Sequence, residues 1–200
     1  FWAPDADNPE HIARSSVALD DPGGKISEFP HLIVNQARVL DYFAEYAKNA
    51  PARLTPDYGL EFVGLTIHDG EDYPVEVTLR HTVGDKEGQE CTVKAKYVIG
   101  CDGAHSRVRE SIGRKHIGAV SNHAWGVMDV LATTDFPDIR TKCAIQSSTG
   151  GSILLIPREG GHLFRMYVDL GEVPENDNHQ IRQTTLETTI KKANQILHPY

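Results

Sequence analysis

The first stretch whose residue types suit chemistry is YVIGCDGAHSRVR, residues Tyr97–Arg109. A β-branched, apolar run ends at Gly100, and Asp102 follows directly before Gly103. Glycines let a backbone turn tightly and approach a bound ligand closely. A carboxylate at the carboxyl end of a strand can accept hydrogen bonds from ribose or ribityl hydroxyls. The stretch therefore predicts a strand-to-helix corner at which a ligand binds.

The polar residues that follow this corner allow two interpretations. Ser106 suits the N-cap of the next helix. Arg107 and Arg109 carry charges that could hold a phosphate or form an ion pair with Asp102. The alternative is a plain capped corner whose arginines lie at the surface. The residues alone leave both interpretations open.

Two further polar side chains lie on predicted strands, and the residues alone leave their roles open. Tyr167 lies in an alternating stretch, which places it on one face of a strand with Leu163 and Arg165. Lys142 is the first residue of the predicted strand Lys142–Gln146, and an ammonium group inside an apolar pocket would pair with a carboxylate. A core tyrosine and a solvated edge-strand lysine are the simpler alternatives, and they stay open.

The corner resembles a known motif. Asp102–Arg109 has the pattern DGxxSxxR and is similar to the DG motif of the flavin-dependent aromatic hydroxylases, which have the p-hydroxybenzoate hydroxylase fold. Further stretches, in order along nearly the whole chain, resemble the phenol 2-monooxygenase and 3-hydroxybenzoate 4-monooxygenase branch. They are Phe29–His31, Asn35–Arg38, Trp125–Asp129, Ala144–Ser147, Ile156–His162 and Leu197–Tyr200.

Two motifs of this family are absent from the sequence. The family begins with a strand, a GxGxxG loop and a helix that hold the ADP part of FAD. It also carries a later Gly-Asp motif beside the flavin. The pairs Gly150-Gly151 and Gly160-Gly161 both lack the GxGxxG spacing. We therefore expect the chain to be a central section of a longer protein, and we expect the isolated section to be inactive.

The resemblance implies roles for individual residues. Contacts with FAD are implied for Gln36, Asp102, Gly103 and Arg109. Tyr167 is the implied catalytic residue, because its hydroxyl would bind the phenolic oxygen of the substrate and stabilise a phenolate. Lys142 and His31 are the implied substrate-binding partners of a carboxylate, together with Tyr167.

The resemblance also implies an activity for the full-length protein. FAD is reduced by NADPH or NADH and reacts with O2 to give a flavin C4a-hydroperoxide, which hydroxylates a phenolic ring. The protein supplies positioning and electrostatics. Lys142 and His31 favour a 3-hydroxybenzoate-like substrate, in the catabolism of aromatic compounds. The alternatives are a phenol 2-monooxygenase that acts on simple phenols, or a non-catalytic fragment that cannot hold FAD alone.

Periodicity predicts the elements of the first half of the chain. Apolar residues recur at three- and four-residue steps after Asn35, a suitable N-cap, and Pro51 ends this helix. Between Leu60 and Val98, alternating stretches predict three antiparallel strands. The last of them, Cys91–Ile99, is expected to lead into a helix near Ser106–Ile112.

The remaining elements complete a mixed α/β prediction. Residues 1–28 suggest one or two short strands, four strands follow between residues 125 and 170, and Ile181–Leu197 has an amphipathic helical pattern. The predicted fold is a partial FAD-binding domain with a three-stranded β-meander, plus a substrate-domain sheet covered by helices. We assign residues 1–28 and 116–200 to the substrate domain and residues 29–115 to the FAD-binding domain.

Composition limits the partners of the chain. A formal net charge of -8 argues against a nucleic acid or an anionic membrane. Three cysteines without a CxxC predict reduced thiols in the cytoplasm. The sequence contains no HxH or HExxH motif and no Cys/His cluster, so no metal site is predicted. No apolar run is long enough to span a membrane. The expected partners are a small phenolic substrate, O2 and NAD(P)H, and a homodimer of the full-length protein is left open.

Overall fold

The computed structural model describes residues 1–200 except 20, 22, 30, 120, 175–176 and 178–179. The chain divides into two compact units, and each is described by itself. The first unit consists of Phe1–Tyr42 and Val120–Tyr200, and the second consists of Phe43–Ala119.

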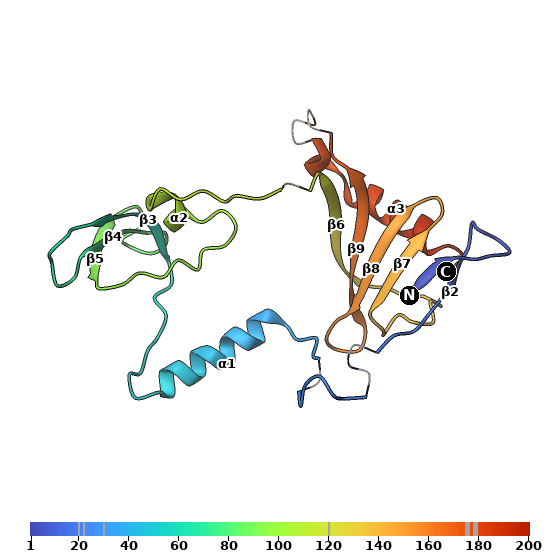
Figure 1. The fold of residues 1–200 in the computed structure, drawn as a ribbon, viewed down its shortest axis with the longest axis horizontal. Helices are drawn as coiled ribbons and strands as arrows, with labels where there is room; N and C mark the ends of the chain where they lie inside the picture. The colour runs from blue at the N-terminus through green and yellow to red at the C-terminus, as the bar shows by residue number, and fades with distance from the viewer. Residues whose placement is uncertain (20, 22, 30, 120, 175–176, 178–179) are drawn as a thin grey trace. The chain divides into compact units, whose positions relative to one another are not determined.

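The described part of the first unit is built on a six-stranded sheet (Figure 1). Its strands are β1 (Trp2–Pro4), β2 (Ile12–Arg14), β6 (His123–Leu131), β7 (Cys143–Ser147), β8 (Gly151–Pro157) and β9 (Leu163–Glu172). The order across the sheet is β2-β1-β7-β8-β9-β6. β1 and β7 run parallel and the other neighbours run antiparallel, so the sheet is mixed. The strands near the N-terminus therefore join the same sheet as those after residue 120.

One face of this sheet carries the hydrophobic core of the unit. Every second side chain of the first half of β9 is buried: Phe164, Met166 and Val168. Alternation along a strand places Arg165 and Tyr167 on the opposite face. The helix α3 (Leu186–Leu197) packs on the buried face and adds Ala193, Ile196 and Leu197 to the core.

The closing helix begins later than the periodicity predicts. The structure has a short 3-10 helix, η1 (Gln180–Gln183), followed by α3 from Leu186. Thr185 is the N-cap of α3, because its Oγ1 accepts a hydrogen bond from the backbone N–H of Thr188 at 3.2 Å. The prediction of one helix from Ile181 was therefore wrong at its start. The apolar periodicity continues from η1 into α3, but the N-cap Thr185 starts a new helix between them.

Every residue of the second unit is described, and its sheet is a three-stranded antiparallel meander in the order β3-β4-β5. The strands are β3 (Leu60–Ile67), β4 (Val75–His81) and β5 (Glu90–Ala95), and a short helix α2 (Arg107–Ser111) follows. The predicted meander and the mixed α/β class are confirmed. The functional division at residues 28 and 115 stays a prediction.

The last strand of the meander ends earlier than predicted. β5 ends at Ala95, opposite Val75, and the segment that continues to Ile99 is not a strand. Tyr97 is 86% exposed and Ile99 is 85% exposed. The β-propensity of these residues is not sufficient to form a strand, because a strand requires a hydrogen-bonded neighbouring strand. This unit provides no such neighbour beyond Ala95.

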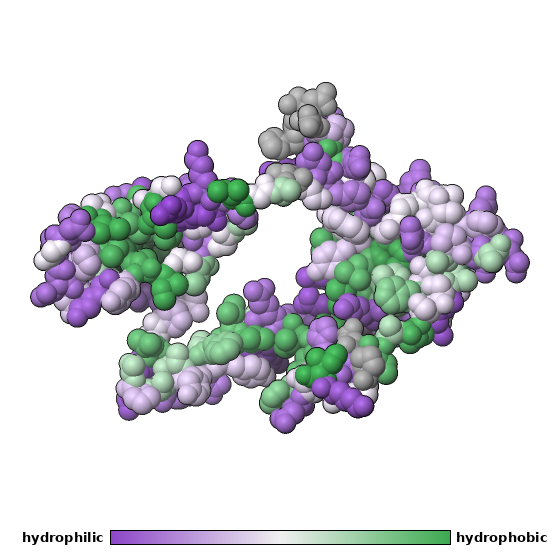
Figure 2. Space-filling view, in the orientation of Figure 1, coloured by the Kyte–Doolittle hydropathy of each residue, from purple (hydrophilic) through white to green (hydrophobic). Residues whose placement is uncertain are grey.

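The helix α1 (Gln36–Asn49) has the predicted limits. Asn35 caps it, since Asn35 Oδ1 accepts a hydrogen bond from the N–H of Ala37 at 2.9 Å, and Pro51 follows the C-terminal end. All residues of this helix are described and none is buried. Apolar side chains such as Phe43 therefore lie at the surface, and hydrophobic residues are visible on both α1 and the meander in Figure 2.

Candidate functional site

The predicted catalytic tyrosine lies on the sheet face opposite α3. Tyr167, in the middle of β9, pairs with Val127 of β6 and with Leu154 of β8. Leu154 in turn pairs with Ala144 of β7. Val127 is 53% exposed, in contrast to the buried side chains of the core face. We call this side of the sheet, which carries Tyr167, Leu154 and Ala144, the open face.

Lys142 lines a cavity at the open face. It directly precedes β7, and its side chain is exposed. The cavity has a volume of about 570 Å³, and its lining includes Lys142, Ala144, Leu154 and Pro157. Earlier residues contribute to its lining as well: Val17, Ala18, Leu19 and Ile33. Leu154 thus lies near two of the three predicted substrate residues, because it lines the cavity with Lys142 and pairs with Tyr167.

The segment before α1 carries the predicted residues His31 and Gln36. His31 is exposed and lies two residues before Ile33, which lines the cavity of Lys142. Gln36 is the first residue of α1, and its side chain is exposed. An exposed amide can donate to and accept from a ligand without adding charge. Ligand contacts for both residues stay predictions.

An ion pair beside Tyr167 was missed by sequence reasoning. Arg165 donates from Nε and Nη2 to the two carboxylate oxygens of Asp129, at 2.7 and 2.8 Å. The bond with Asp129, and after it the contact with Tyr167, raises the pKa of Arg165. The same bond lowers the pKa of Asp129. The two residues face each other across β6 and β9, so the pair becomes visible only when the strand register is known.

The predicted corner in the second unit is a capped helix start. The carboxylate of Asp102 accepts hydrogen bonds from Ser106 Oγ at 2.5 Å and from the N–H groups of Arg107 and Val108 at 2.7 and 3.1 Å. These bonds, led by the one from Ser106, lower the pKa of Asp102. Gly103 has a φ of 79°, a conformation that favours glycine. Both carboxylate oxygens therefore stabilise the first turn of α2.

The two arginines of the corner bind partners other than Asp102. Arg107 forms an ion pair with Glu61 of β3 and also donates to the carbonyl of Phe62 at 3.4 Å. Arg109 donates from Nη2 to the carbonyl of Ala104 at 2.6 Å. The suggested ion pair with Asp102 was therefore wrong, because the helix N-terminus already occupies this carboxylate. A phosphate contact of Arg109 stays a prediction.

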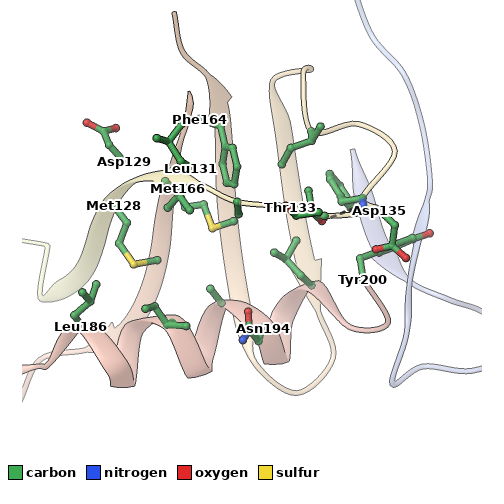
Figure 3. A pocket seen from close by; sticks show the side chains of 18 residues that line it. Met128, Asp129, Leu131, Thr133, Asp135, Phe164, Met166, Leu186, Asn194 and Tyr200 are labelled. Atoms are coloured by element: carbon green, nitrogen blue, oxygen red, sulfur yellow. Dashed lines mark hydrogen bonds between the residues drawn. The ribbon is translucent and has the colours of Figure 1, made fainter. Parts of the chain in front are cut away.

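A second cavity lies on the other side of the sheet, between α3 and the ends of β6 and β9 (Figure 3). It has a volume of about 520 Å³, and its lining is largely apolar, with Met128, Phe164, Met166 and Leu186. Figure 3 shows Asp129 pointing away from this cavity. No predicted site residue is among the described residues that line it. The cavity of Lys142 on the open face is therefore the better candidate for a substrate site.

The described residues provide neither a metal site nor a membrane-spanning helix. They contain no group of three or more His, Cys, Asp or Glu side chains arranged to hold a metal ion. None of the described helices combines the length and the apolar character needed to cross a membrane.

Comparison with known proteins decides the family. The model of the FAD binding domain family matches residues 9–199. The chain belongs to this family. It is 50% identical, over its whole length, to a 3-hydroxybenzoate 4-monooxygenase of Comamonas testosteroni, and it spans 31% of that protein. The expected resemblance to flavin-dependent aromatic hydroxylases is thereby confirmed.

Two further relatives match all or most of the chain. It is 37% identical, again over its whole length, to the FAD-dependent monooxygenase terD of Aspergillus terreus, and it spans 31% of that protein. It is 35% identical over 70% of its length to the phenol 2-monooxygenase fsqG of Aspergillus fumigatus, of which it spans 23%. The chain therefore corresponds to about a third, or less, of the length of these relatives.

The residues of this chain fit one part of FAD. The exposed amide of Gln36 suits sugar or ribityl hydroxyls. A side chain at Gly103 would meet nothing within 4 Å, so this turn leaves space for a ligand. A GxGxxG loop, which would bind the pyrophosphate at a helix N-terminus, does not occur in residues 1–200. Gln36 belongs to the first unit and Gly103 to the second, and a contact of either residue with FAD stays a prediction.

Proposed function

We propose that this chain is the substrate-facing section of an FAD-dependent monooxygenase that hydroxylates a phenolic ring, with a 3-hydroxybenzoate-like compound as its substrate. NADPH or NADH is the proposed reductant. The observation that carries this proposal is Lys142, which lines the open-face cavity beside Leu154, the cross-strand neighbour of Tyr167. The 50% identity to a 3-hydroxybenzoate 4-monooxygenase supports the same substrate class.

Each proposed contact has a simple physical purpose. The hydroxyl of Tyr167 binds the phenolic oxygen and stabilises the negative charge that makes the ring nucleophilic. The ammonium group of Lys142 pairs with the substrate carboxylate and so fixes the orientation of the ring. Gln36 holds FAD by hydrogen bonds without adding charge. FAD, when bound and reduced by NAD(P)H, would activate O2, so that one oxygen atom enters the ring and the other leaves as water.

The substitution Lys142→Met in the full-length enzyme tests this function. Loss of a charge-assisted hydrogen bond costs about 1.5–3 kcal/mol. We therefore expect the KM for 3-hydroxybenzoate to rise about tenfold or more, while any turnover of phenol changes little. Lys191→Met, at an exposed position of α3, is the matched control. An unchanged KM for 3-hydroxybenzoate in the Lys142 variant would defeat the proposed carboxylate contact.

A second candidate is a phenol 2-monooxygenase. It is favoured by the identity of 35% to a protein of that name and by apolar side chains such as Leu19, Ile33 and Leu154, which line the cavity together with Lys142, Asp138 and Arg140. The same kinetic comparison separates the two functions. A wild-type enzyme that turns over phenol efficiently and ignores 3-hydroxybenzoate is a phenol hydroxylase.

A further inference from the structure

The loop between β8 and β9 is held in place by an arginine from a distant position. Arg140 donates from Nη1 to the carbonyl of Leu163 and from Nη2 to the carbonyl of Arg158, both at 2.7 Å. The N–H of Arg158 donates to the carbonyl of Leu163 at 2.9 Å. These bonds close the base of the loop at the first residue of β9. The next residue, Glu159, therefore has a backbone that is fixed relative to the strand of Tyr167.

Glu159 uses this position to contact the segment before α1. Its Oε1 accepts a hydrogen bond from Asn35 Nδ2 at 2.8 Å. The guanidinium of Arg158 donates to Oε2 at 3.1 Å and to Oε1 at 3.3 Å, which orients the carboxylate. Arg158, and after it Asn35, lowers the pKa of Glu159 to about 2, so the acceptor is ionised at neutral pH.

Asn35 performs two tasks with one side chain. Its Oδ1 accepts from the N–H of Ala37 and caps α1, while its Nδ2 donates to Glu159. Gln36 follows directly. Because none of the residues of α1 is buried, packing within the described chain does not fix the start of this helix. The hydrogen bond between Asn35 and Glu159, which we call the Asn35–Glu159 bridge, joins this start to the β8–β9 loop.

We propose that Glu159 is a positioning residue for FAD, which acts through Asn35 to hold Gln36 in register with the strand that carries Tyr167. This inference rests on the proposed function, because it assumes that Gln36 contacts the cofactor. Glu159 itself contacts neither FAD nor the substrate in this proposal. It aligns the first turn of α1 with β9, so that the cofactor contact and the substrate contact have a fixed separation.

The proposal is tested in the full-length protein by exchanging the hydrogen-bond donor and acceptor of the bridge. Asn35→Asp keeps the N-cap, since aspartate and asparagine cap equally well, but it replaces the donor by a carboxylate that faces Glu159. We expect the Kd of the apoprotein for FAD, measured by flavin fluorescence, to rise several-fold. Adding Glu159→Gln supplies an amide donor opposite the new acid, and it should return the Kd towards the wild-type value. Glu10→Gln, at an exposed loop position, is the control.

Two results for FAD affinity would overturn the positioning role of Glu159. One is an Asn35→Asp variant with unchanged FAD affinity, and the other is a double variant that stays as weak as the single one. The Tm of the apoprotein must not fall in parallel with the affinity, since a parallel fall indicates a merely structural role.

Gln36→Ala separates this inference from the proposed function. If Gln36→Ala weakens FAD binding and Asn35→Asp does not, only the bridge is wrong. If Gln36→Ala has no effect, the proposed contact of Gln36 fails as well.

Discussion

At the scale of residues, Asp102 shows why sequence alone left two interpretations open. A ligand hydroxyl and a helix N-terminus both require an acceptor at the same carboxylate, so the residue types are identical in the two cases. The structure shows three donors from Ser106, Arg107 and Val108 on this group. A carboxylate offers about four acceptor sites. Capping therefore leaves few acceptor sites of Asp102 free, and a cofactor that binds at this corner must share the carboxylate with α2.

Ser106→Ala should loosen this corner. Ser106 is 7% exposed, and its Oγ donates to Asp102 and accepts from the N–H of Arg109 at 3.0 Å. Removal of such a cap typically costs about 1 kcal/mol. We expect the amide of Arg109 to lose several-fold protection in hydrogen exchange of the full-length protein. Ser111→Ala, at the exposed end of the same helix, should leave this amide unaffected. Equal protection in both variants would contradict the capping role.

At the scale of elements, single capping and helix-breaking residues decided which element boundaries could be predicted. The limits of α1 follow from Asn35 and Pro51, because a cap and a helix breaker act locally. The start of α3 was misplaced, because Thr185 divides an apolar period that continues on both sides. The pair of Asp129 and Arg165 was also missed, since it depends on the register between two strands. Local signals were therefore visible in the sequence, whereas signals between elements were not.

Gly150→Ala should disturb the packing of α3 on the sheet. A Cβ at Gly150 would lie 2.6 Å from Cγ1 of Ile196, whose side chain is 0% exposed. Overpacking of this kind costs about 1–3 kcal/mol. We expect a lower Tm in thermal unfolding of the full-length protein. Gly64→Ala is the matched control, because nothing lies within 4 Å of the added carbon. A Tm as high as that of the control would show that α3 adapts.

At the scale of the whole molecule, the sequence predicted the mixed α/β class and the meander but not the end of its last strand. The run from Tyr97 to Ile99 has strong β-propensity, and this made the extension past Ala95 reasonable. Propensity describes only the residue, whereas strand formation depends on a neighbour. In the second unit, all of which is described, that neighbour is absent and both side chains are exposed. The discrepancy thus identifies an apolar, strand-forming segment without a partner strand.

Such a segment should make the chain of residues 1–200 associate with itself. Exposed apolar strand segments are sites of pairing with other chains. Tyr97 and Ile99 would share one face if they became a strand. We therefore expect the double substitution Tyr97→Lys and Ile99→Lys to lower both the binding of a hydrophobic dye and the mass seen in sedimentation. Glu87→Lys, in the exposed β4–β5 hairpin, changes the net charge by the same two units and is the control. If this control disperses the chain equally well, charge repulsion rather than loss of the apolar segment is responsible, and the segment is not the site of association.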